Sequence, residues 1–262
     1  MLSSGYIQAD ETPIQVLEED KKGSTHRGYY WVYHSPEKKL VLFDYRPGRG
    51  REGPQDILQT FEGYLQTDAY SAYDSFDKGK IKLLHCMAHA RRMFEKALGN
   101  DNVRANHALF KIQSLYAIER YFRENEISTE EKLQLRQQDA VPILKEMELW
   151  MKEEIIKVTP QSLIGKAIAY SLSRWDKLSL YASDGRLEID NNLVENSIRP
   201  VAIGRKNYLF AGSHDAAQRA AVIYSLLGTC KKNNIEPEQW LKNTLSVIAD
   251  YKTNQLSKLL PI

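Results

Sequence analysis

Short apolar and aromatic runs in the first 50 residues predict a group of strands. Residues 28–34 are rich in tyrosine, tryptophan and valine, the composition typical of strands. Residues 39–45 form a second such run, and Pro36 marks a short turn between the two. Together with a buried strand expected at 6–12, these runs predict an antiparallel three-stranded meander.

Two shorter runs extend the predicted sheet. Residues 63–67 and 81–85 have the length and apolar character of short strands. A short helix is expected at 54–61, between the meander and the first of these strands. Short strands after a meander, with a helix between them, predict a mixed sheet covered by helices.

The pattern becomes helical from Met87 to about residue 181. Ser128 predicts a helix start as N-cap, with Glu131 at the reciprocal position of a capping box. Pro142 is expected to break or kink the long helical stretch near 130–157. Pro160 is expected at the first position of the next helix. Further helices are predicted at the ranges 190–199, 214–233 and 237–250, the last opened by a proline.

The composition is that of an ordinary soluble protein. Of 262 residues, 42% are hydrophobic and 27% charged, and a net charge of +2 is too small to indicate nucleic acid by itself. Two cysteines give no disulfide framework and are typical of a reducing cytosol. Because no apolar run approaches 18 residues, we expect no membrane span and a cytoplasmic location.

Three acidic residues carry the candidate chemistry. Asp10 and Asp68 lie near the ends of predicted strands, and Glu195 lies on a late predicted helix. Carboxylates are the ligands that Mg²⁺ prefers, and a pair of such ions supports phosphoryl transfer. With 34 acidic residues in the chain, any one of the three taken alone is more simply interpreted as an ordinary acidic residue without a metal.

Cys86 and His89 have the spacing of half a zinc site. A structural zinc site needs four ligands, and the sequence offers no second pair at suitable spacing. Cys86 is therefore expected to be a buried residue that ends the fifth strand. His89 then lies on the first turn of a helix, either supporting a metal ligand or phosphate, or as a satisfied core histidine.

Several motifs occur together in a recognisable order. They span residues 9–12, 63–70, 86–94, 190–196, 198–207 and 210–213, with a tail from 223 to 241. In this order the chain resembles the insertion-sequence-66 family of bacterial DDE transposases. The resemblance covers nearly the whole chain.

The resemblance implies an α/β fold of the ribonuclease H-like type, with a mixed sheet, flanking helices and a large all-helical insertion before the catalytic glutamate. It implies a first part of the core at 1–98, the insertion at 99–185 and core completion at 186–262. It also implies that Asp10, Asp68 and Glu195 are the catalytic triad and hold two Mg²⁺ or Mn²⁺ ions.

A transposase acts on DNA, so the resemblance implies transposon ends and target DNA as partners. Phosphate contacts are expected from basic side chains, which neutralise the phosphates of the DNA backbone and release its counterions. The candidates are Arg91, Arg92, Arg199, Arg205 and Lys206. A homo-oligomer, accessory proteins of the element and association with the nucleoid are further expectations.

The sequence departs from the family in one respect. Members usually carry an N-terminal region with a leucine-rich helical segment and a zinc-finger-like part, and this chain begins just before the first catalytic strand. Two alternatives to a transposase therefore stay open. One is a truncated, non-catalytic remnant with weak DNA binding, and the other is a metal-dependent nuclease of the same fold.

Overall fold

A five-stranded sheet in the order β3-β2-β1-β4-β5 organises the computed structural model, which describes residues 1–18, 23–77 and 79–262. Strands β1 (Tyr6–Leu17), β2 (Thr25–Ser35) and β3 (Leu40–Arg46) pair antiparallel in sequence, which confirms the meander. The predicted end of the first strand at residue 12 was wrong, because β1 continues for five more residues.

Pro13 lies inside β1 without disrupting its pairing with β2. The carbonyl oxygen of Pro13 accepts a hydrogen bond from the Arg205 side chain, so it faces away from β2. In an antiparallel strand the N and O of one residue point to the same side, so the missing N–H costs no bond to β2. Beyond this point Ala211 pairs with β1, with its N–H bonded to Gln15 and its carbonyl to Leu17.

Strands β4 (Gly63–Thr67) and β5 (Ile81–His85) have the predicted bounds. Gly63 N–H bonds to Lys80 at the start of the pair, and Cys86 N–H bonds to Thr67 at its end. Both strands therefore run in the same direction, and the sheet is mixed. Helix α1 (Glu52–Leu58) precedes β4 and begins and ends earlier than the expected 54–61.

The chain divides into two compact units. The sheet unit comprises residues 1–65, 70–82 and 192–262. The helical unit comprises residues 66–69 and 83–191. The predicted division at 98/99 and 185/186 stays a prediction.

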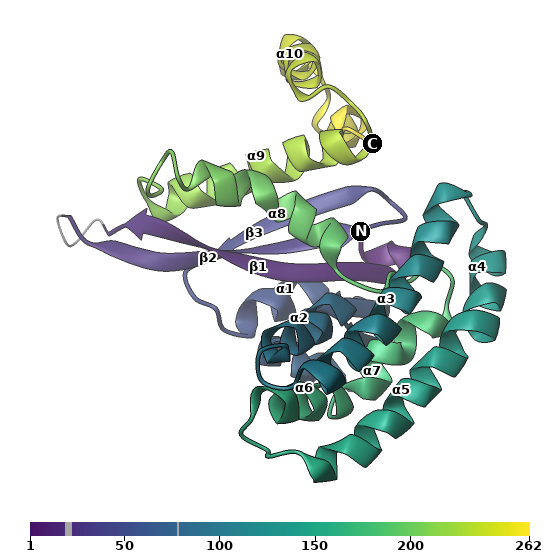
Figure 1. The fold of residues 1–262 in the computed structure, drawn as a ribbon. Coiled ribbons are helices and arrows are strands. Elements are labelled where there is room, and N and C mark those ends of the chain that lie inside the picture. The colour runs from purple at the N-terminus through teal and green to yellow at the C-terminus, as the bar shows by residue number, and fades with distance from the viewer. Residues whose placement is uncertain (19–22, 78) are drawn as a thin grey trace. The chain divides into compact units, whose positions relative to one another are not determined.

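One face of the meander carries the core of the sheet unit. Helices α8 (Asn192–Gly204) and α9 (His214–Lys232) cover this face, as Figure 1 shows. The cluster consists of alternating strand residues and one stripe of each helix: Ile14, Val16, Tyr30, Val32, Val41, Phe43, Tyr45, Val194, Ile198, Val201, Ala217 and Ala221. The opposite face carries Trp31, whose ring meets α1 at Gly53, where an added Cβ would lie 2.8 Å from the indole nitrogen.

The outer edge of β3 is covered by polar side chains of α9. The Ser225 and Thr229 hydroxyls accept from the N–H groups of Phe43 and Val41 at 2.8 and 3.1 Å. Asn233 donates to the Lys39 carbonyl at 3.1 Å. Four helical residues rise about 6 Å and two strand residues about 6.7 Å, so one helix face follows the strand. We call Ser225, Thr229 and Asn233 the edge ladder, because they satisfy groups that an edge strand leaves open.

Helices α2 to α7 form the helical unit. Their bounds are Met87–Ala97, Asn102–Glu124, Thr129–Leu135, Val141–Glu154, Leu163–Leu172 and Trp175–Ser179. Ser128 caps α4 by accepting from Glu131 N–H at 3.2 Å, as predicted. A π-helical turn at Arg136–Ala140 precedes Pro142, so the helical stretch changes register there without ending.

The predicted helix start at Pro160 was wrong. Helix α6 begins three residues later, and its N-cap is Ser162, whose hydroxyl accepts from Gly165 N–H at 3.0 Å. A serine N-cap accepts a hydrogen bond from a free N–H of the first turn, whereas a proline at the first helical position adds no such bond. Short 3₁₀ turns occupy Leu2–Ser4, Ser71–Phe76, Ile155–Lys157, Leu180–Ser183, Ile248–Asp250 and Thr253–Leu259, and the last α-helix, α10, spans Pro237–Val247.

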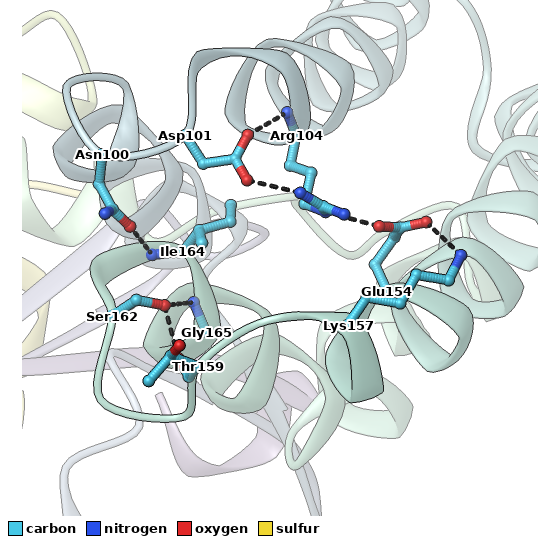
Figure 2. A network of polar contacts seen from close by, with 9 residues as sticks. All are labelled: Asn100, Asp101, Arg104, Glu154, Lys157, Thr159, Ser162, Ile164 and Gly165. Carbon is cyan, nitrogen blue, oxygen red and sulfur yellow. Dashed lines mark hydrogen bonds and ion pairs between the residues drawn. The ribbon is translucent and has the colours of Figure 1, made fainter.

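A polar network joins the start of α3 to the end of α5 (Figure 2). Asp101 caps α3 by accepting from Arg104 N–H at 3.0 Å, and it also pairs with the Arg104 guanidinium at 2.7 Å. Arg104 donates in turn to Glu154 at 2.5 Å, and Lys157 completes the chain of charges. The network therefore fixes two helix ends of the helical unit against each other.

A buried ion pair lies deeper in the helical unit. The Arg136 guanidinium donates to both carboxylate oxygens of Glu119, at 2.8 and 2.7 Å. Its remaining hydrogen bonds go to the carbonyl oxygens of Tyr181, Asp184 and Leu187. Because each charge has a partner and the guanidinium donors are used, the pair holds the segment 181–187 in place.

Candidate functional site

Asp10 lies in the middle of β1, on the face of the meander that α8 covers. Side chains alternate along a strand, so Asp10 shares this face with Gln8 and Ile14, and it lies opposite Val32 on β2. Its side chain is half-buried. One carboxylate oxygen accepts the backbone N–H of Glu11 at 2.8 Å.

Glu195 lies in the first turn of α8, and two side chains hold that turn. The Gln8 amide oxygen accepts from Val194 N–H at 3.2 Å, and Lys232 donates to the Leu193 carbonyl at 2.9 Å. Gln8 is fully buried, and its amide nitrogen donates to the Tyr6 hydroxyl at 3.0 Å. A residue two positions from Asp10 therefore binds the residue next to Glu195.

The apolar stripe of α8 sets the direction of its side chains. Val194, Ile198 and Val201 recur at helical spacing and pack into the core cluster. Glu195 is one residue, or about 100°, from Val194 and so lies beside this stripe, half-buried at its rim. No described residue forms a hydrogen bond or ion pair with its carboxylate. The sheet unit thus brings Asp10 and Glu195 to one face of β1.

Asp68 follows directly after β4 and belongs to the helical unit, where it is half-buried. In this unit Cys86 N–H bonds to the Thr67 carbonyl at 3.1 Å, which holds the end of β5 beside the Asp68 turn. Burial raises the pKa of Tyr170, and the charge of Asp68 adds to that rise against the opposing Arg174. The place of Asp68 in a triad stays a prediction.

Cys86 and His89 lie where the sequence predicted. Cys86 is buried and immediately precedes α2, and His89 is half-buried in the first turn of that helix. The His89 backbone N–H bonds to the Cys86 carbonyl at 3.2 Å, which closes the turn. The supporting role of His89 stays a prediction.

The segment before α8 is fixed within the helical unit. Gln66 donates to the Glu188 carbonyl at 2.8 Å, and Met87 N–H donates to the Ile189 carbonyl at 3.0 Å. The Tyr116 hydroxyl donates to Asp190 at 2.8 Å. Burial, reinforced by the Asp190 carboxylate, raises the pKa of Tyr116. These hydrogen bonds fix residues 188–190, which directly precede the segment leading into α8.

The five basic residues predicted to contact phosphate differ in whether they already form contacts within the protein. Arg91 is half-buried and pairs with Glu95 at 3.3 Å on its own helix, whereas Arg92 is exposed. Arg199 and Lys206 are exposed on and after α8, and half-buried Arg205 donates to Pro13. The exposed members present positive charge to solvent, as a phosphate contact requires.

Arginines of the loop after β3 are tied to the protein. Arg49 donates to Glu11 at 2.8 Å and lies over the Tyr70 ring, 4.0 Å from its centroid. Arg46 pairs with Asp44 and Asp56, both at 2.6 Å. These contacts give both side chains a structural role.

Gln8 and Lys232 were not found from the sequence. Alternation along β1 places Gln8 on the face of Asp10, and a fully buried glutamine in a strand signals a fixed partner. That partner is 186 residues away in sequence, so no local pattern identifies it. Nothing in the sequence indicated that Lys232 binds the start of α8, because a lysine near a helix end is ordinarily solvated.

The donor chemistry of Asp10 and Glu195 fits a hard divalent cation. Both offer carboxylate oxygen, and both are half-buried on one face of the sheet unit. Mg²⁺ and Mn²⁺ prefer such ligands and keep water or substrate oxygens in their remaining positions. The two residues can therefore form part of a metal site.

Family comparison gives a match along nearly the entire chain. Residues 1–219 match the model described as "Transposase IS66 family", and residues 225–262 match the "IS66 C-terminal element". No solved structure matches the chain. Over the described residues, no helix combines the length and hydropathy that crossing a bilayer requires.

Two relatives from Sinorhizobium fredii are similar over almost the whole chain. The uncharacterized protein y4hP is 32% identical over 97% of this chain and 50% of its own length. The uncharacterized protein y4qI is 33% identical over 97% of this chain and 50% of its own length. The uncharacterized protein YuaK of Escherichia coli is 45% identical over 19% of this chain and 52% of its own. The chain thus spans about half the length of y4hP and y4qI.

Proposed function

Because the chain belongs to the IS66 transposase family, we propose that it is a DDE-type catalytic region that cleaves DNA and joins it with the help of divalent metal. One observation carries the proposal. The Gln8–Val194 hydrogen bond brings the Glu195 turn onto the face of β1 that holds Asp10. Two elements far apart in sequence, each carrying one of the proposed carboxylates, thereby pack against each other.

The proposed fold is ribonuclease H-like. Support comes from the strand order β3-β2-β1-β4-β5, in which a three-stranded meander is followed by a parallel pair of short strands. The helical unit, at 83–191 apart from the Asp68 turn, has the place in sequence of the expected insertion before Glu195. We retain 1–98, 99–185 and 186–262 as the proposed division of the domain.

In this proposal Asp10, Asp68 and Glu195 hold two Mg²⁺ or Mn²⁺ ions. Bound ions of this kind stabilise charge on the attacking and leaving oxygens of a phosphodiester. The carboxylates fix the positions of the ions, and Gln8 and Lys232 fix the helix that carries Glu195. His89 is proposed to support the Asp68 side of the site.

The proposed substrates are transposon ends and target DNA, reached in the cytoplasm at the nucleoid. Exposed Arg92, Arg199 and Lys206 are proposed to contact phosphates, with Arg91 and Arg205 as partly engaged contributors. A homo-oligomer and accessory proteins of the element belong to the same proposal. The chain as a whole has nearly balanced charge, so its net charge gives little attraction to DNA. Contact with DNA is therefore assigned to these local basic side chains.

Substitution of each carboxylate by its amide tests the proposal. Asp10→Asn, Asp68→Asn and Glu195→Gln keep the side-chain shape and remove the charge that a cation needs. Each should lower Mn²⁺-dependent cleavage of plasmid DNA by about 100-fold or more, as removal of a group that stabilises developing charge does. Unfolding midpoints should change little. The matched control is Asp74→Asn, which changes an exposed aspartate of the sheet unit.

Full activity of Asp68→Asn would remove Asp68 from the site. Strand transfer of pre-cut oligonucleotide ends is measured in parallel, because a nuclease of the same fold cleaves DNA without joining it. Wild-type protein that neither cleaves nor joins DNA in the presence of Mn²⁺ would favour the non-catalytic remnant.

A further inference from the structure

The connection between α8 and α9 exposes large apolar side chains to solvent. Leu209 is 71% exposed and Phe210 44%, and Ile203 at the end of α8 is 62% exposed. Single exposed apolar residues are common, but these three lie within eight residues of one another. A clustered apolar surface of this kind needs an explanation.

The connection is held firmly at several points. Arg205 donates to the Pro13 carbonyl at its start, and Ala211 pairs with Gln15 and Leu17 of β1 at its end. Between them the Tyr208 hydroxyl bonds to that of Tyr224 at 2.7 Å. The exposed residues are therefore presented by a fixed segment of backbone. The exposure of Leu209 and Phe210 is therefore not the result of a loosely held backbone, because hydrogen bonds hold their neighbours in place.

The Asp, Glu, Lys and Arg side chains within this stretch of sequence have one sign. Residues 196–214 contain no aspartate or glutamate, although the chain has 34 acidic residues in all. The same stretch contains Arg199, Arg205 and Lys206, and the first and last of these are exposed. A fixed segment that combines positive charge with exposed aromatic and apolar side chains has the features of a single-strand nucleic-acid contact.

The distance to Glu195 relates this surface to the proposed reaction. Glu195 and Gly204 are nine residues apart in α8, which corresponds to about 13.5 Å at 1.5 Å per residue. At 3.4 Å per step along one strand of a duplex, this is about four nucleotides. A strand whose reacting phosphate lies at Glu195 therefore reaches the segment within a few nucleotides.

We propose that residues 205–210 form a contact for unpaired DNA, in which Phe210 stacks on a base and Leu209 packs beside it, a few nucleotides from the reacting phosphate. This inference rests on the proposed function, since it takes DNA as the substrate. An unpaired base is the favoured partner because its flat face is free to stack, whereas a paired duplex covers these faces and offers mainly phosphates at its surface.

Binding of two DNA probes tests the contact. The first is a blunt duplex, and the second is the same duplex with a single-stranded tail of five thymidines at its end; both carry a fluorophore for anisotropy. Phe210→Ala should weaken binding of the tailed probe about 10-fold, as loss of one base–aromatic stack does, and leave the blunt probe unchanged. The matched control is Phe110→Ala, which removes an aromatic side chain that is 69% exposed on α3.

Lys206→Gln separates charge from stacking. It should weaken both probes and lower the salt dependence of binding by about one phosphate contact. Equal binding of the tailed probe by wild type and Phe210→Ala would overturn the stacking contact and leave the proposed function standing. No binding of either probe by the wild-type chain would overturn both. Self-association that Phe210→Ala abolishes, with DNA binding unchanged, would assign the surface to a second copy instead.

Discussion

The two units use their polar side chains in different ways. In the helical unit, charged side chains neutralise one another, as in the buried Glu119–Arg136 pair and the Asp101–Arg104–Glu154 network (Figure 2). In the sheet unit, ion pairs such as Arg46–Asp56 involve partly exposed side chains, and the buried polar side chains instead satisfy backbone groups. The edge ladder does so for β3, and Gln8 and Lys232 do so for α8.

The difference indicates which unit can supply chemistry. A charge that is already paired and buried has no capacity left for a ligand, and removal of its partner is strongly destabilising. In the sheet unit, the open backbone groups of the β3 edge and of the start of α8 form hydrogen bonds with uncharged amides and hydroxyls and with one lysine. Glu195 therefore stays available on a helix whose position is fixed by other residues. Most of the helical unit is scaffold, and the residues of this unit proposed to act in the site are confined to the Asp68 turn and to His89, Arg91 and Arg92 of α2.

The largest effect is expected from the buried pair. Glu119→Leu leaves the Arg136 charge without its partner in a buried position and should lower the free energy of unfolding by about 3–5 kcal/mol. Urea denaturation followed by circular dichroism measures it. Glu124→Leu on the same helix changes an exposed glutamate and should shift stability by less than about 0.5 kcal/mol. Similar small effects of both variants would contradict a structural role for the pair.

The edge ladder should give an intermediate effect. Thr229→Val keeps the shape of the side chain but removes the partner of the Val41 N–H, at a cost of about 1–3 kcal/mol. An open edge also invites pairing with another chain, so light scattering should show increased self-association. Thr253→Val is the control, because Thr253 is exposed and caps no strand. Unchanged stability and association would show that the hydroxyl is dispensable.

The smallest effect is expected at Asp101, a half-buried residue of the polar network between α3 and α5. The Arg104 backbone N–H, and then its guanidinium, hold the pKa of Asp101 below its ordinary value of 3.8. The charge therefore stabilises the fold above this value, and the contribution is lost as the pH falls below it. Asp101→Asn keeps a capping oxygen and should cost less than about 1 kcal/mol at pH 7.

The pH dependence gives the sign of this effect. The difference in unfolding free energy between wild type and Asp101→Asn should shrink from pH 7 to pH 3, as the wild-type carboxylate takes up its proton. A difference that grows over this range would mean that Asp101 does not stabilise the fold as an anion.

The sequence predicted the elements better than their ends and contacts. Both short strands β4 and β5 have the predicted bounds, because each is a local apolar run. The end of β1 was missed: its last five residues pair with Thr25 to Tyr29 of β2, and Ala211, about 200 residues later, adds a bridge on the other side. The start of α6 was missed because proline was favoured over the serine two residues beyond it.

The candidate residues illustrate the same limit. Asp10 and Glu195 were chosen by motif, and the structure brings their two elements together through Gln8. Nothing local in the sequence indicates that a strand glutamine binds the first turn of a helix 186 residues later. The exposure of Leu209 and Phe210 was equally hidden, since apolar residues are ordinarily expected to be buried.

A crystal structure of the protein soaked with Mn²⁺ tests the central claim most directly, because anomalous scattering locates the ion. The account predicts manganese bound by the carboxylates of Asp10, Asp68 and Glu195, and its loss from crystals of Asp10→Asn. Manganese bound only elsewhere, or none at these three carboxylates at saturating concentration with DNA bound, would contradict it.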